Sequence, residues 1–277
     1  MQLRKVTAAS AAVLALSLAA TACGGDKKDD NGSSGGKKIA IGIKFDQPGL
    51  GQKTPQGYAG FDVDVATYVA KKLGYGPDQI EWKESKSADR ETMLQRGDVQ
   101  FIAATYSITP EREQKVDFAG PYLLAHQDVL LRADETAIKA PKDLNGKKLC
   151  SVSGSTSAQN LKAKLNLKTD LVTYPTYSAC LSGLQSGAID ALTTDDSILA
   201  GYAAQAQFKG KFKLGNFKMT NENYGIGVKK GSDLKAKVNT ALESMVSDGS
   251  WAAAVKKNFG PADYKNEPAP KVGDVKS

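Results

Sequence analysis

Residues that commonly build metal and redox centres are rare in this chain. Among its 277 residues there are three cysteines and a single histidine, His126. Cys23, Cys150 and Cys180 do not stand at the spacings, to one another or to His126, that zinc sites use. We therefore expect no metal centre and no cofactor.

Long apolar runs are equally scarce, which argues against a body that spans a membrane. Only Ala8–Ala20 is uncharged and mainly apolar, and it is too short to cross a bilayer comfortably. It follows Arg4 and Lys5 and ends in small residues, as the apolar segment of an export signal does. Residues 1–22 are therefore expected to be a signal peptide.

Cys23 comes directly after this segment. A pair of small residues followed by cysteine resembles the bacterial lipobox, in which the cysteine is acylated and becomes the mature N-terminus. Residues 23–37 are polar and cannot bury enough apolar surface to fold, so we expect a flexible tether. The chain would then be lipid-anchored through Cys23 at the extracellular face of the cell membrane. The alternative is an ordinary secretory signal followed by a chance cysteine.

Export would place the other two cysteines, Cys150 and Cys180, in an oxidising compartment. An even pair in such a compartment is expected to form a disulfide, and the alternative is two buried free thiols.

The charge of the chain has no strong pattern. The formal net charge is +7, but the lysines are scattered along the sequence. Scattered charge gives little support to nucleic-acid binding, and a mildly basic body suits an anionic ligand.

The remaining chain alternates strand-like and helix-like segments, which predicts an α/β fold. In one helix Phe61, Val65, Val69 and Leu73 recur at four-residue spacing, and Asp62 is suited to be its N-cap. The expected strands and helices, in order, are Lys38–Ile43, Asp62–Leu73, Ile80–Lys83, Asp89–Arg96, Val99–Ala104, Lys148–Val152, Ser155–Lys164, Asp170–Tyr174, Tyr177–Gln185, Ala188–Thr193, Leu234–Val246 and Ser250–Asn258.

One internal similarity suggests two related lobes. Leu94–Thr105 and Leu184–Asp195 each contain a helix end, a glycine suited to a C-cap and an apolar strand. Thr105 and Asp195 occupy equivalent positions at the ends of these strands. Ligands of open α/β sheets bind beyond the carboxyl ends of strands, so we expect one of these residues in each lobe near a ligand. A chance match over so few residues is the alternative.

The segment Ala104–Arg112 has the groups that hold a carboxylate. It combines hydroxyl side chains, turn amides before Pro110, and the guanidinium fork of Arg112. The alternative is a surface arginine beside a capped helix start.

Several further segments carry a resemblance to a known family. They are Gly60–Val65, Ser107–Arg112, Val116–Phe118, Pro121–Tyr122, Asp143–Lys147, Gly154–Thr156 and Tyr224–Gly231. With them the chain resembles the family 3 extracellular solute-binding proteins, the polar amino-acid receptors of ABC importers. Lys44–Gly51, Ala104–Ile108 and Thr193–Asp196 are similar to the Gram-positive glutamate-binding lipoproteins of that family.

The resemblance implies a two-lobed periplasmic-binding-protein fold of type II, with the ligand cleft between the lobes. Lobe 1 would contain residues 38–130 and 224–277, and lobe 2 would contain residues 131–223. Two crossing strands, near Gln127–Leu131 and Met219–Gly225, would form the hinge. The expected partners are an amino acid and the permease of an ABC transporter, with a monomeric receptor and no nucleic acid.

The resemblance also implies roles for individual residues. Arg112 would clasp the ligand α-carboxylate, helped by the Thr105 hydroxyl and the Ser107 backbone N–H. Thr156, at a helix N-terminus in the other lobe, would add a donor where orphan amides favour anions. Asp195 would take the α-ammonium.

Selectivity for the side chain must come from other residues. Arg90 stands where the acidic amino-acid receptors have an arginine, and it could pair with a side-chain carboxylate, as could Lys44 at the end of the first strand. Either residue could instead be a solvated surface cation. The family's aromatic stacking residue is not evident; Gln47 falls near its place, and Tyr58 is a candidate replacement. We expect glutamate as the ligand, with aspartate or glutamine as alternatives.

Two other functions share this resemblance. An enzyme on the same fold, a prephenate-type dehydratase, would need a general acid or base, and only His126 and Asp196 are candidates. An extracellular sensor would normally continue into a transmembrane helix, whereas this sequence finishes in a polar tail. We expect a binding protein without catalysis, in which His126 is structural or makes a contact between lobes.

Overall fold

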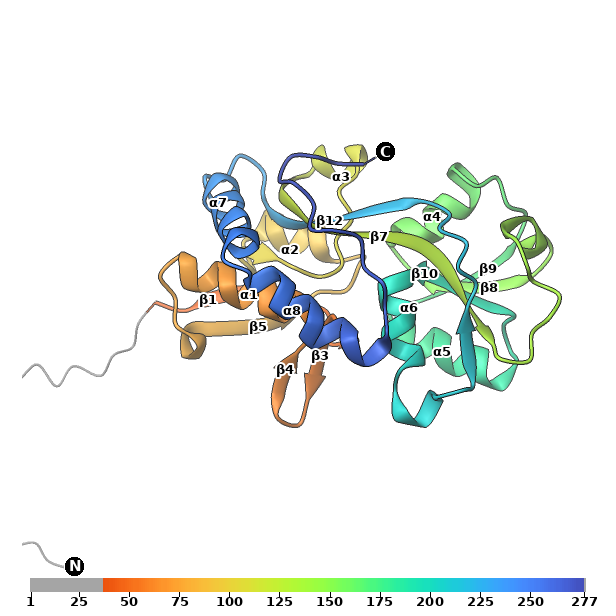
Figure 1. The fold of residues 1–277 in the computed structure, drawn as a ribbon. Helices are drawn as coiled ribbons and strands as arrows, with labels where there is room; N and C mark the ends of the chain where they lie inside the picture. The colour runs from red at the N-terminus through yellow and green to blue at the C-terminus, as the bar shows by residue number, and fades with distance from the viewer. Residues whose placement is uncertain (1–36, 277) are drawn as a thin grey trace, which may run out of the picture. The chain divides into compact units, whose positions relative to one another are not determined.

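A computed structural model describes residues 37–276 of the chain (Figure 1). The expected signal peptide and Cys23 lie outside the described residues. No helix within residues 37–276 combines the length and the apolar character needed to cross a membrane.

Strands and helices alternate along most of the described chain. The strands are β1 (Ile39–Ile43), β2 (Asp46–Gln47), β3 (Gly51–Thr54), β4 (Gly57–Ala59), β5 (Ile80–Glu84), β6 (Phe101–Ile102), β7 (Val116–Arg132), β8 (Lys148–Val152), β9 (Asp170–Tyr174), β10 (Ala191–Asp195), β11 (Phe212–Leu214) and β12 (Asn221–Lys229). The α-helices are α1 (Phe61–Lys72), α2 (Arg90–Arg96), α3 (Pro110–Glu113), α4 (Thr156–Ala163), α5 (Tyr177–Ser186), α6 (Asp196–Ala203), α7 (Leu234–Ser247) and α8 (Ser250–Phe259). Short 3₁₀ turns cover Pro77–Gln79, Pro141–Leu144, Ala206–Phe208 and Gly260–Ala262.

The long strand β7 joins two groups of strands. Its residues 116–126 pair with β12, and its residues 127–132 pair with β10 and β11. On one side β6 pairs antiparallel with β12, and β1 and β5 follow parallel to β6; on the other side β8 and β9 follow parallel to β10. Each half is thus a small α/β unit, and Figure 1 shows β7 and β12 running between them. The expected two-lobed type II fold is confirmed.

The expected hinge segments coincide with these shared strands. Gln127–Leu131 lies inside β7, and Met219–Gly225 overlaps the start of β12. The residue limits of the two lobes stay a prediction.

The apolar residues of helix α1 form the face that packs into the core. Phe61, Val65 and Val69 are fully buried, as the four-residue spacing predicts. The expected N-cap is wrong: the helix begins at Phe61 after Gly60, and Asp62 lies inside the first turn. Gly60 has a φ of 125°, and a Cβ there would lie 2.0 Å from the carbonyl oxygen of Leu50, so only glycine fits this entry.

Several boundaries differ from the sequence-based expectation. Strand β6 is limited to Phe101–Ile102, and β10 begins at Ala191 because the preceding residues complete the turn after α5. Gly97 and Gly187 are the expected left-handed C-caps, with φ values of 80° and 78°. The hairpin strands β2 to β4 and helix α6 were not expected.

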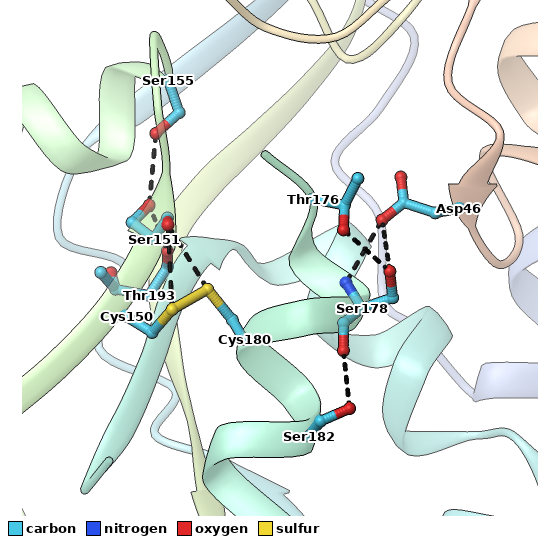
Figure 2. Close-up of a disulfide and its surroundings, with 9 residues drawn as sticks. All are labelled: Asp46, Cys150, Ser151, Ser155, Thr176, Ser178, Cys180, Ser182 and Thr193. Carbon is cyan, nitrogen blue, oxygen red and sulfur yellow. Dashed lines mark hydrogen bonds between the residues drawn. A yellow bond between two sulfur atoms is a disulfide. The ribbon is translucent and has the colours of Figure 1, made fainter. Parts of the chain in front are cut away.

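Cys150 and Cys180 form the expected disulfide. Cys150 lies in β8 and Cys180 in α5, so the bond fixes this helix to the sheet of the second lobe (Figure 2).

Candidate ligand-binding site

The loop after β6 presents Thr105 in an uncommon backbone conformation. Its φ is 45°, in the left-handed region that β-branched residues rarely adopt. The Thr105 N–H donates to Asp62 Oδ2 at 2.9 Å, and the Tyr122 hydroxyl donates to Asp62 Oδ1 at 2.7 Å. Burial raises the pKa of Asp62 to about 6, and these two donors oppose that rise. Asp62, which the sequence suggested only as a helix cap, therefore positions the loop.

Arg112 lies on the short helix α3, which Thr109 caps by accepting the Arg112 N–H at 3.3 Å. The guanidinium is buried: Nη1 donates to the Ser107 carbonyl at 2.8 Å and Nη2 donates to the Gly154 carbonyl at 3.0 Å. Glu91 lies 3.6 Å from Nε. Because Gly154 belongs to the loop between β8 and α4, Arg112 connects the two lobes.

Thr156 opens helix α4, whose N-cap Ser155 accepts the Ala158 N–H at 3.1 Å. The Thr156 hydroxyl lies 3.4 Å from the Ser107 hydroxyl and donates to Glu222 Oε2 at 2.8 Å. The structure therefore brings two expected ligand donors from opposite lobes into contact. Their neighbour Glu222 is a buried carboxylate that the sequence analysis missed.

Asp195 ends β10 and precedes helix α6. Its Oδ2 accepts the Tyr224 hydroxyl at 2.6 Å, and its Oδ1 accepts the Ser157 hydroxyl at 3.3 Å. Burial, followed by the nearby Glu222 carboxylate, holds the pKa of Asp195 well above its usual range. A cation placed beside this pair would relieve both effects.

Arg90 is buried and is not a solvated helix-start residue. Its Nη1 donates to the carbonyls of Ala104 and Thr105 at 3.0 and 3.3 Å, and its guanidinium lies 4.0 Å from the centre of the Tyr106 ring. Its Nε is buried and has no hydrogen-bond acceptor within residues 37–276. Burial, with Arg112 next in effect, lowers its pKa to about 10.

Lys44 is also buried, and its Nζ donates to the Ser87 hydroxyl at 2.8 Å. Burial lowers the pKa of Lys44 well below its usual value, and Arg90 and Arg112 lower it further. The first lobe therefore holds three buried cations that repel one another, whereas Asp195 and Glu222 form a separate pair of buried carboxylates.

Gln47 adds a buried donor beside Thr105. Its side chain is fully buried, and its Oε1 accepts the Thr105 hydroxyl at 3.2 Å. Its Nε2 has no acceptor within the described part of the chain. Tyr58, the candidate stacking residue, instead packs against Phe45 and Trp82 at ring-centre distances of 5.1 and 5.8 Å.

His126 and Asp196 contact the C-terminal segment. His126 Nε2 lies 3.1 Å from Glu267, and Asp196 Oδ1 accepts the Tyr264 hydroxyl at 2.8 Å. The described residues contain no group of three or more potential metal ligands.

These features define a two-lobed ligand-binding protein in which Ser107 and Arg112 of one lobe contact Thr156 and Gly154 of the other. Residues 39–261 match the profile of the bacterial extracellular solute-binding proteins, family 3, and the chain belongs to this family.

Individual relatives agree with this assignment. The chain is 44% identical over 275 residues to the glutamate-binding protein GluB of Corynebacterium efficiens, spanning 93% of this chain and 91% of that one. It is 38% identical over 224 residues to the ABC transporter glutamine-binding protein GlnH of Bacillus subtilis, spanning 79% and 80%. A solved ancestral arginine-binding protein bound to arginine has a TM-score of 0.74 at 33% identity, over 80% of this chain and 98% of that one. Such relatives are receptors rather than enzymes, and the chain is a binding protein.

Proposed function

We propose that this protein captures an acidic amino acid, glutamate, and delivers it to the permease of an ABC transporter. The carrying observation is the distribution of buried charge between the two lobes and the strand β12 that they share. Lys44, Arg90 and Arg112 lie in the first lobe, while Asp195 lies in the second and Glu222 on the shared strand β12. A ligand with two carboxylates and one ammonium complements this distribution.

The α-amino and α-carboxylate groups would be held as the family resemblance implies. Arg112, Thr105 and Ser107 would bind the α-carboxylate, with Thr156 adding its helix N-terminus from the other lobe. Asp195 would bind the ammonium, which would also offset the repulsion from Glu222. To accept the ligand, the Arg112 guanidinium would exchange a carbonyl partner for a carboxylate, which is the stronger hydrogen-bond acceptor.

The side-chain carboxylate would be recognised by the remaining donors. A buried carboxylate needs charged or hydrogen-bonding partners to offset its desolvation. Arg90 Nε and Gln47 Nε2 are buried donors that lack an acceptor in residues 37–276, and Lys44 supplies a third donor. A glutamine amide would turn an N–H group toward these donors, whereas a glutamate carboxylate presents acceptors only.

Calorimetry on the protein without its signal peptide, with Cys23→Ser, tests the proposal. Titration with glutamate, aspartate, glutamine and arginine should give the tightest binding for glutamate. Light scattering on the same sample should show the mass of a monomer, because all of these charged groups come from a single chain.

We further propose that the receptor is exported and anchored through acylated Cys23 at the outer face of the membrane. The signal-like residues 1–22 and the small residues before Cys23 support this proposal. In a Gram-positive host the wild type should incorporate labelled palmitate and fractionate with the membrane. Cys23→Ser should lose the label and appear in the medium; retained label would contradict acylation at Cys23.

A further inference from the structure

Asp46, on β2 of the first lobe, reaches across to the second lobe (Figure 2). Its Oδ2 accepts the backbone N–H and the hydroxyl of Ser178, each at 3.2 Å. It also accepts the Tyr202 hydroxyl at 3.1 Å. Asp46 therefore touches two helices of the second lobe, α5 and α6, and none of these contacts involves a residue assigned above to the ligand.

Helix α5 lacks a capping bond from its own N-cap residue. Thr176 precedes the helix, but its side chain makes no capping hydrogen bond and its hydroxyl lies 3.0 Å from the Ser178 hydroxyl. The first backbone N–H groups of a helix have no partner within the helix, and a carboxylate there is favoured by the helix dipole. Because Ser178 is the second residue of α5, Asp46 does for this helix what an N-cap normally does, from the opposite lobe.

The surrounding surfaces fit closely. The Tyr202 hydroxyl also donates to the backbone carbonyl of Asp46 at 2.5 Å. A Cβ at Gly201 would lie 2.0 Å from the carbonyl oxygen of Pro48, so α6 can approach the β2 turn only because residue 201 is glycine. The disulfide of Cys180 fixes α5 to β8, so a force on the start of α5 acts on the whole second lobe.

We infer that Asp46 is a positioning residue for ligand capture: it caps α5 only while the lobes are together and so stabilises the closed cleft. This inference rests on the proposed function, in which the ligand is held between the two lobes. Opening exposes the N–H groups of α5 and removes their carboxylate. Part of the affinity for every ligand then comes from Asp46, which touches none of them.

The inference predicts a particular pattern of affinities. Loss of an N-cap corresponds to about a 2- to 30-fold change in an equilibrium. Asp46→Ala should weaken both glutamate and glutamine by factors in that range, and should speed dissociation. Asp46→Asn keeps an oxygen acceptor and should recover part of the loss. Asp190→Ala is the matched control: Asp190 accepts the Lys148 N–H at 2.8 Å within the second lobe, and its loss should leave affinity unchanged.

The experiment combines titration calorimetry with hydrogen exchange of the Ser178 amide at saturating ligand. In the wild type this amide should be protected, and Asp46→Ala should remove the protection while circular dichroism shows that the variant is folded. Unchanged affinity in Asp46→Ala, together with unchanged protection of the Ser178 amide, would overturn the inference that Asp46 stabilises the closed state. A ratio of glutamate to glutamine affinity that differs between Asp46→Asn and Asp46→Ala would also overturn it, because both variants remove the charge that acts on Lys44 and they differ only in the capping oxygen.

Failure of the proposed function gives a different result. If the wild type binds another amino acid in place of glutamate, the same variants are compared with that ligand, and weaker binding in Asp46→Ala is still required. If it binds no amino acid, solution scattering of the free proteins provides the test. Asp46→Ala should have a larger radius of gyration than the wild type, and equal radii of gyration would overturn the inference that Asp46 stabilises the closed state.

Discussion

The carboxylate of Asp62 accepts the backbone N–H of Thr105 at 2.9 Å, across 43 residues of sequence. Thr105 has a φ of 45°, a conformation that costs free energy at a β-branched residue and persists only where neighbours hold it. The first turn of α1 therefore sets the shape of the loop that carries Thr105 and Ser107. The positions of the candidate ligand-binding residues Thr105 and Ser107 therefore depend on a helix that is distant from them in sequence.

Arg112 should be needed for every amino-acid ligand. Removing one partner of a buried, hydrogen-bonded charge pair costs about 2–5 kcal/mol, which is roughly 30-fold to several thousand-fold in affinity. Arg112→Ala should weaken glutamate, aspartate and glutamine by similar factors in calorimetry. Near-wild-type affinity for any of them would remove Arg112 from the α-carboxylate site.

Arg90 should decide between glutamate and glutamine. Arg90→Ala removes a buried cation and also the bonds to the Ala104 and Thr105 carbonyls, so some loss is expected for both ligands. The loss specific to the side-chain carboxylate should appear as a collapse of the glutamate-to-glutamine affinity ratio. Lys44→Ala should lower the ratio less, because an ammonium lacks the planar fork.

Arg132 provides the control for these two variants. It also donates to two backbone carbonyls, those of Leu184 and Ile189, at 3.3 and 2.8 Å, but within the second lobe. Arg132→Ala should lower the melting temperature and leave the affinity ratio unchanged. A ratio that moves equally in Arg90→Ala and Arg132→Ala would show that Arg90 acts on stability alone.

Acidification should weaken ligand binding through Asp195. The ligand ammonium pairs with the ionised carboxylate, and the pKa of Asp195 is raised by burial and by Glu222, so protons compete at a higher pH than at an ordinary aspartate. Affinity should therefore fall as the pH decreases toward this raised pKa, while the carboxylates of glutamate are still ionised. Asp195→Asn should bind more weakly and lose this pH dependence; an unchanged pH profile in this variant would contradict the role.

The disulfide should stabilise the second lobe. Cys150 and Cys180 are separated by 30 residues, and closing a loop of that length contributes about 3–4 kcal/mol in the chain-entropy model. The Cys150→Ser, Cys180→Ser double variant should lower the free energy of unfolding by about that amount in urea titrations. Non-reducing mass spectrometry of the wild type should find no free thiol at either position.

Local patterns allowed much of the fold to be predicted. The spacing of Phe61, Val65 and Val69 identified the buried face of α1, and Gly97 and Gly187 marked two helix ends. Only the Gln127–Leu131 part of the 17-residue strand β7 was expected, since its residues 116–126 and 127–132 pair with different partners and no single local period describes the whole strand.

The candidate site also contains some residues that the sequence identified and others that it did not. Arg112, Thr105 and Ser107 stand in one short segment with an evident chemical pattern, so the sequence sufficed to select them. Glu222 contacts Thr156 across 66 residues, and Gln47 contacts Thr105 across 58, and neither has a local signal. Asp62 was given a capping role from its position alone, because its actual partners are brought close only by the folded sheet.

The most direct test of the central claim is the relative affinity of the wild type for glutamate, glutamine and arginine. It should be measured by calorimetry at two ionic strengths, since pairs inside a closed cleft are poorly screened by salt. We expect glutamate to bind most tightly. The ratio of its affinity to that of glutamine should decrease only modestly at the higher salt concentration. Tighter binding of glutamine or arginine than of glutamate would contradict the acidic-ligand assignment.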